Sequence, residues 1–114
     1  MNDELINDLA HVINEEVRTF HSLLDVLRSE QRAIVEDDIE EIERCVEAQR
    51  EVAVVAHELE SKRVHVVERI AEQSDIGDGN MSLGRLVKAL EGPKVEELAQ
   101  MRQKLLQLNE KIRS

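Results

Sequence analysis

The sequence predicts an all-α protein: a long antiparallel helical hairpin with one short and one longer C-terminal helix, packed as an elongated bundle. Apolar residues over the first third of the chain recur at alternating steps of four and three, which is the spacing of one helix face. The chain is 41% hydrophobic and 35% charged, with one aromatic residue, four Gly and one Pro, a composition typical of helical bundles. Its length of 114 residues indicates a single domain, residues 1–114.

The first helix is expected to begin near Asp3 and to end near Val35. Neither Gly nor Pro interrupts this stretch, and a helix of about 30 residues is roughly 45 Å long. Its apolar face needs cover from another element, and one partner helix would cover the edge of the face only in part. The main stripe consists of Ile6, Ala10, Ile13, Val17, Phe20, Leu24, Leu27, Gln31 and Ile34, and a second row consists of Leu9, Leu23 and Val35.

A tight turn is expected at residues 36–38, because three acidic residues break the apolar pattern there. Asp38 is a good N-cap, and Glu41 stands three residues later, as in a capping box. The second helix is expected from Ile39 to about Gln73, and so short a turn makes the two helices antiparallel neighbours. Its seam consists of Ile42, Cys45, Gln49, Val52, Ala56, Leu59, Arg63, Val66 and Ile70.

After this hairpin (residues 1–73), the sequence predicts a loop over residues 74–81 and a C-terminal helical region over residues 82–114. Gly, Asp and Asn in the loop favour turns. Ser82 is expected to cap a short helix from Leu83 to Leu90, which Gly92 and Pro93 end. The last helix is expected from about Pro93 to the C-terminus. Its apolar stripe consists of Val95, Leu98, Met101, Leu105, Leu108 and Ile112.

Charge and segment length argue against several functions. The net charge of −10 would repel nucleic-acid phosphates, and no Tyr or Trp is present to stack on bases. No run approaches the 18 apolar residues of a membrane span. The N-terminus lacks the basic and apolar regions of a signal peptide, and one Cys cannot form an internal disulfide. These features predict a cytoplasmic protein.

No residue pattern indicates catalysis or a cofactor. The four His residues form no His pair four apart and no Glu-x-x-His motif, so neither common helical metal site is present. Residues 75–80 lack the ligand spacing of a calcium loop. Cys45 lies in the helix seam and is interpreted as a small buried hydrophobe. We therefore expect no catalytic, metal-binding or cofactor-binding residue and no enzymatic activity.

Three polar residues interrupt the apolar stripes: Gln31, Gln49 and Arg63. Burying a polar group is unfavourable unless it is paired. Arg63 has two interpretations. It lies at the rim with its stem over apolar surface, or it bonds Glu15 or Glu16 across the hairpin and sets the register, as single polar residues do in coiled coils.

The chain resembles the FlgN-type flagellar export chaperones in the order of its elements and in a diffuse pattern along most of its length. The residues that carry the resemblance are Glu16, Phe20 to Leu24, Leu27, Glu30 to Val35, Asp37 and Asp38 before Ile42, Leu59 to Arg63, Met81 to Leu83 with Leu86, and Leu105 to Asn109. The resemblance implies a cytoplasmic helical chaperone without enzymatic activity. Such chaperones bind the hook–filament junction (hook-associated) proteins, keep them soluble and bring them to the flagellar type III export machinery.

The resemblance also implies that the client protein offers a C-terminal amphipathic helix, which the chaperone binds through its own C-terminal helical region. Members of the family usually continue well past the Asn that Asn109 matches, whereas only residues 110–114 follow here. The predicted client-binding residues are therefore Leu98, Met101, Leu105, Leu108 and Ile112. Alternatively, this stripe packs on the hairpin as a third helix. The alternative function is a structural or adaptor coiled coil that assembles as a homo-oligomer and has no export role.

Overall fold

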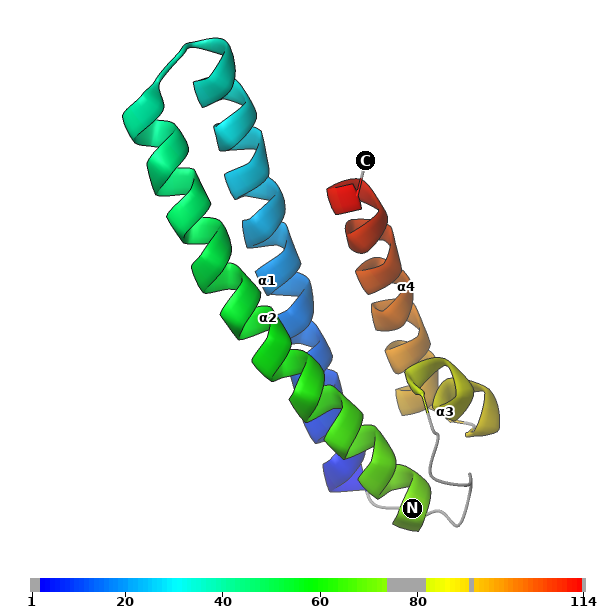
Figure 1. Ribbon diagram of the computed structural model, residues 1–114. Coiled ribbons are helices and arrows are strands. Elements are labelled where there is room, and N and C mark those ends of the chain that lie inside the picture. The colour runs from blue at the N-terminus through cyan, green and yellow to red at the C-terminus, as the bar shows by residue number, and fades with distance from the viewer. Residues whose placement is uncertain (1–2, 74–81, 91, 114) are drawn as a thin grey trace.

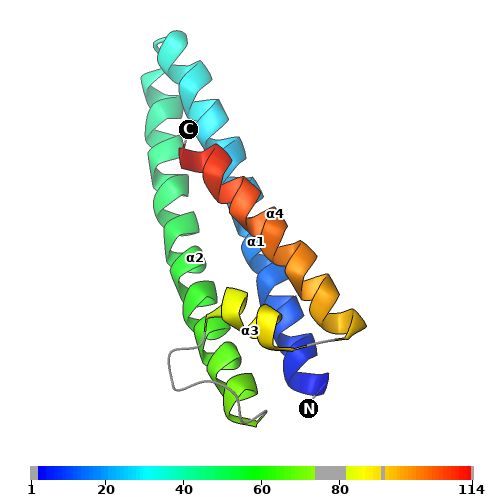
Figure 2. The ribbon, with the colours of Figure 1, turned by 90° about the vertical axis from the view of Figure 1, so that its right-hand side faces the viewer.

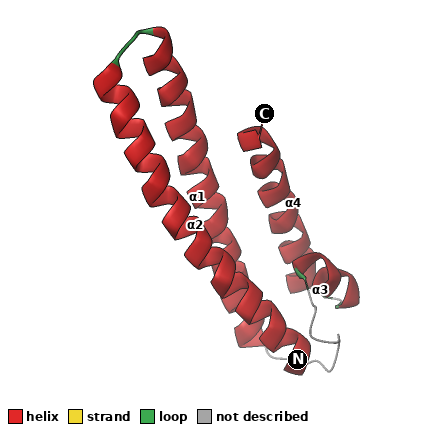
Figure 3. Cartoon of the chain, in the orientation of Figure 1, coloured by secondary structure: helices red, strands yellow, loops and turns green. Residues whose placement is uncertain are grey.

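The computed structural model describes residues 3–73, 82–90 and 92–113, and these form four helices (Figure 1). The helices are α1 (Asp3–Val35), α2 (Ile39–Gln73), α3 (Leu83–Ala89) and α4 (Pro93–Arg113). No strand occurs in the described part of the chain, as Figure 3 shows. The molecule measures 56 × 22 × 21 Å along its principal axes. These observations confirm the all-α, elongated fold class, whereas the loop predicted at residues 74–81 lies outside the described residues.

The end of α1 is a Schellman motif, which closes the helix through two backbone hydrogen bonds. The Asp38 N–H donates to the Ala33 carbonyl at 2.9 Å, and the Asp37 N–H donates to the Ile34 carbonyl at 3.2 Å. Asp37 has a φ of 55°, in the left-handed region that Asp tolerates better than most residues. The chain therefore reverses within residues 36–38, as the sequence predicted.

The predicted N-cap of α2 is confirmed, but the capping box is only half formed. The Glu41 N–H donates to Asp38 Oδ1 at 3.2 Å. The Glu41 carboxylate does not complete the box, because the Asp38 N–H that it would bind already donates to the Ala33 carbonyl. Its Oε2 accepts hydrogen bonds from Nε and Nη2 of Arg44 at 3.0 and 2.6 Å instead. The side chain of Asp38 is thus the part of the motif that starts α2.

The short helix α3 begins at its predicted cap and ends one residue early. The Arg85 N–H donates to Ser82 Oγ at 3.2 Å. Leu90 is extended, with φ −107° and ψ 155°, although its N–H still donates to the Leu86 carbonyl. Gly92 has a φ of 127°, a conformation that is strained for any residue with a side chain. The chain turns at Gly92, and α4 begins at the next residue.

The helices pack as an up-down-up arrangement with a short cross-piece. Figures 1 and 2 show that α1 and α4 run in the same direction and that α2 runs antiparallel to them. Helix α4 lies along α1, and α3 bridges α2 and α4 at the end of the bundle where the chain starts. The main core lies at this end and consists of Leu5, Ile6, Leu9, Ile13, Val67, Ile70, Leu83, Leu86, Leu98 and Met101.

The apolar face of α1 is covered unevenly along its length. Leu9, which a hairpin alone would leave partly covered, is fully buried, because residues of α3 and α4 join the core around it. Toward the hairpin turn, α4 ends short of the tip (Figure 1). Ile34, Val35 and Ile39 are 54%, 85% and 66% exposed there. The predicted stripe is therefore a core seam at its start and an exposed surface at its end.

Candidate functional site

A groove with a volume of about 700 Å³ lies between the hairpin and the C-terminal half of α4. We call it the central groove. It forms because α4 packs against α1 and α3 but not against α2, within the described part of the chain. Its lining comes from all four helices: Glu16, Phe20, Leu23, Ala53, Ala56, His57, Glu60, Arg63, Ser82, Leu83, Gly84, Arg102, Leu105, Leu106, Asn109 and Arg113.

The apolar part of the central groove is accessible along much of its length. Phe20 and Leu23 of α1 and Leu105 of α4 are half-buried, and Leu106 of α4 is 46% exposed. Two small residues of α2, Ala53 and Ala56, form the opposite wall. An apolar, elongated hollow between helices has the shape and chemistry that receive one face of an amphipathic helix.

The central groove is bounded at one end by an ion pair across the hairpin. Arg63 Nε of α2 donates to Glu16 Oε1 of α1 at 2.8 Å, and the two side chains are 22% and 4% exposed. Burial raises the pKa of the Glu16 carboxyl above its usual value, and the neighbouring Arg63 opposes this shift. Of the two interpretations of Arg63, the structure thus shows a bond to Glu16.

The other polar residues of the predicted seams differ from each other in their surroundings. Gln49 Nε2 donates to Glu30 Oε2 at 2.6 Å, which gives the hairpin a second polar link between α1 and α2. Gln31 is exposed, because α4 does not extend over this part of α1. Only Gln49 and Arg63 therefore form the cross-hairpin pairs expected of polar seam residues.

The five predicted client-binding residues have two kinds of surroundings. Leu98, Met101 and Leu108 are 1%, 8% and 5% exposed, so α4 uses them to pack on the bundle, as in the alternative interpretation of this stripe. Leu105 and Ile112 are half-buried, and Leu105 lines the central groove. Contact of these five residues with a client stays a prediction.

Sequence reasoning missed Leu106 and Arg102 as residues of the site. It placed Phe20 in the main stripe of the first helix, and it expected Leu23, in the second row, to be only partly covered by the hairpin, as its half-buried side chain is. Leu106 stands next to the predicted stripe, so a stripe analysis assigns it to the solvent side. Its position in the groove depends on α4 lying on α1 alone. No spacing in the sequence could show that arrangement, because it involves helices that are not consecutive.

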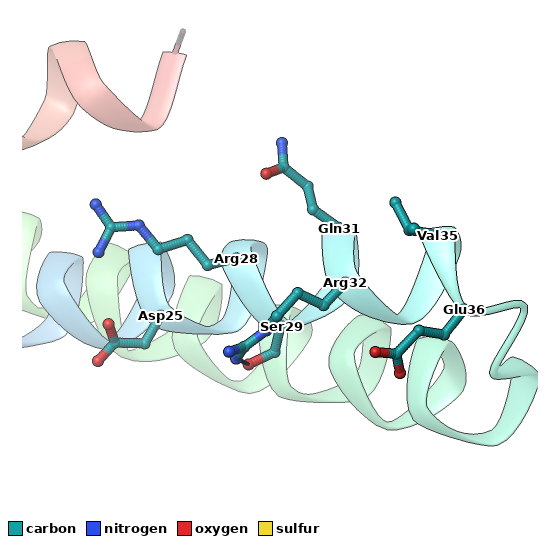
Figure 4. A pocket seen from close by; sticks show the side chains of 7 residues that line it. All are labelled: Asp25, Arg28, Ser29, Gln31, Arg32, Val35 and Glu36. Atoms are coloured by element: carbon teal, nitrogen blue, oxygen red, sulfur yellow. Dashed lines mark hydrogen bonds between the residues drawn. The ribbon is translucent and has the colours of Figure 1, made fainter.

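A second hollow of about 680 Å³ lies on the outer face of α1 beyond the end of α4. Figure 4 shows Arg28, Gln31 and Val35 projecting on the side where α4 ends. On the same helix, Arg32 Nη2 donates to Ser29 Oγ at 3.2 Å. The described lining comes from α1 and from Glu36 directly after it, so this surface is a less enclosed candidate than the central groove.

The described residues contain no group of three or more His, Cys, Asp or Glu side chains that could hold a metal ion. Cys45 is 4% exposed, and burial together with the neighbouring Glu41 raises the pKa of its thiol. Its Sγ donates to Glu41 Oε1 at 3.7 Å. A buried thiol of raised pKa is a poor nucleophile.

None of the described helices has the length and apolar character that a membrane span requires.

The fold and the groove define a class: a helical protein whose main accessible feature is an apolar surface suited to another protein. The family model described as "FlgN protein" matches residues 1–114. The chain therefore belongs to the FlgN family of flagellar export chaperones. No curated protein and no solved structure matches it significantly.

Proposed function

We propose that this chaperone binds hook–filament junction proteins in the cytoplasm, keeps them soluble, and delivers them to the flagellar type III export machinery. The client would insert a C-terminal amphipathic helix into the central groove. The observation that supports this proposal best is the accessible apolar lining between α2 and α4, in a chain of the FlgN family. No enzymatic step is part of the proposed function.

The surroundings of the groove favour a helix over an extended peptide. The groove is bordered by helices rather than by an open strand edge that could pair with an extended chain. Apolar client residues would contact Phe20, Leu23 and Leu106. Of the predicted binding residues, Leu105 and Ile112 would face or flank the client, whereas Leu98, Met101 and Leu108 would hold α4 in place.

The proposal is tested by titrating the purified C-terminal segment of a hook–filament junction protein of the same organism against the chaperone. The variant Leu106→Asp places a charge in the groove at a side chain that is already 46% exposed, so the fold is kept. We expect about a tenfold or greater loss of affinity, because the client's apolar face would desolvate the new carboxylate.

Val54→Asp is the matched control, since Val54 is an aliphatic residue of α2, 59% exposed, outside the groove lining. It should bind the segment as the wild type does. Circular dichroism establishes that both variants stay helical. The proposal fails if the wild type does not bind the segment, or if the two variants bind equally well.

Self-association as an adaptor coiled coil is the second candidate function. It is favoured by the exposed aliphatic residues at the hairpin tip, Ile34, Val35 and Ile39, which a second copy could cover. Light scattering distinguishes the two. A stable dimer that does not bind client segments favours the adaptor, and a monomer that binds them favours the chaperone.

A further inference from the structure

The guanidinium of Arg102 lies in the central groove against the backbone of α3. A Cβ atom placed on Gly84 would be 3.0 Å from Arg102 Nη2 and 3.2 Å from Arg102 Cζ. The absence of a side chain at Gly84 therefore provides the room that the guanidinium occupies. Arg102 is half-buried, and within the described residues it makes no hydrogen bond or ion pair.

A second cation, Arg113, lies at the other end of the same wall. The two arginines are separated by 11 positions of α4, which corresponds to about three helical turns and a rise of about 16 Å. Both therefore lie on the same side of α4, with Leu105, Leu106 and Asn109 between them in the groove lining. The α4 wall thus combines an apolar centre with a positive charge near each end.

The opposite wall differs in charge. It carries Glu60 on α2, and the only other carboxylate in the described lining, Glu16, is already bonded to Arg63. The whole chain has a net charge of −10, so the positive charge on this wall of the groove is opposite in sign to the net charge of the chain. A guanidinium beside apolar surface forms its strongest contacts with a carboxylate, through paired N–H donors.

We propose that Arg102 and Arg113 each bind an acidic side chain of the client helix. The inference rests on the proposed function and adds the chemistry of recognition. The client helix carries two Asp or Glu residues about 11 positions apart on the flank that faces α4, with apolar residues between them. The other flank of the client helix is not acidic where it faces Glu60. The charges therefore also determine which flank of the helix faces α4 and which faces α2.

The test measures affinity for the purified C-terminal segment of a hook–filament junction protein, using Arg102→Glu and Arg113→Glu. Each is expected to weaken binding by about tenfold or more, through loss of one charge-assisted contact and repulsion of the client carboxylate. Arg50→Glu is the control. It changes the net charge equally, but Arg50 is an exposed residue of α2 paired with Glu47 at 3.5 Å, outside the groove lining.

Replacing each acidic residue of the segment by its amide identifies the client side of the contacts. At two positions about 11 residues apart, the amide should weaken binding of the segment to the wild-type chaperone. The variant of the arginine that faces such a position should then cause no further loss of affinity. A lysine at such a position should restore binding to Arg102→Glu. Arg102→Gln, which keeps most of the stem, should also weaken binding while circular dichroism stays unchanged.

The two proposals fail in different ways. If the wild type binds the segment and Arg102→Glu binds it as tightly as Arg50→Glu does, the carboxylate contact is refuted and the chaperone function stands. If the wild type does not bind the segment at all, both are refuted.

Discussion

Replacing Arg63 with Met should destabilise the hairpin markedly at neutral pH. The Glu16 side chain is 4% exposed and Arg63 Nε lies 2.8 Å from its carboxylate, so the variant leaves a buried carboxylate without its cation. Breaking a buried pair costs about 3–5 kcal/mol. Because Arg63 is 22% exposed and Glu16 can take up a proton instead, we expect about 2–3 kcal/mol and a Tm lower by roughly 10 °C.

Chemical denaturation followed by circular dichroism measures this loss. The control Arg50→Met removes an exposed pair with Glu47 and should cost less than about 1 kcal/mol. Spin labels on exposed faces of α1 and α2 report the register of the hairpin. A variant Arg63→Met that is as stable as the wild type, or more stable, with its register unchanged would refute this role of the ion pair.

Two further predictions concern the same hairpin. Burial raises the pKa of Glu16 above its ordinary 4.5, so the folded chain holds this proton more tightly than the unfolded chain, and the stability linked to Glu16 falls as pH rises from 4.5 through the raised value. Glu16→Gln should therefore gain stability relative to the wild type over that range in urea titrations, and a difference independent of pH would contradict this. Asp38→Ala removes the acceptor of the Glu41 N–H and should cost about 1 kcal/mol. Asp37→Gly, at a φ of 55°, should cost nothing, and equal losses in the two would show that the cap is not the cause.

The buried core is concentrated at one end of the bundle, and apolar side chains are exposed at the other end. The buried cluster joins the start of α1, the end of α2, α3 and the start of α4, so one end of the bundle carries most of the packing. The other end consists of a hairpin with exposed Ile34, Val35 and Ile39. The well-packed end therefore supports the exposed apolar surfaces, and the central groove lies between the two ends.

The helices themselves could be predicted from the sequence because their determinants are local. Apolar spacing gave the course of α1 and α2, and Asp38 and Ser82 marked helix starts through bonds to residues three positions away. A bond from Arg63 to Glu15 or Glu16 was one of two interpretations that the sequence allowed, since a short turn makes α1 and α2 neighbours, and the structure shows Glu16 as the partner. Interactions within one helix or across one turn join residues at short and regular separations, so they can be predicted from the sequence.

The placement of α4 was decided only in the tertiary structure. Its apolar stripe could equally meet a client or the hairpin, and the packing of Leu98, Met101 and Leu108 against the bundle depends on which helix α4 lies beside. Because α4 lies along α1 and not α2, the central groove opens and Leu106 and Arg102 line it. Residue order sets the period of a helix face, but the contact between distant helices is set by how their faces fit together, which no local spacing records.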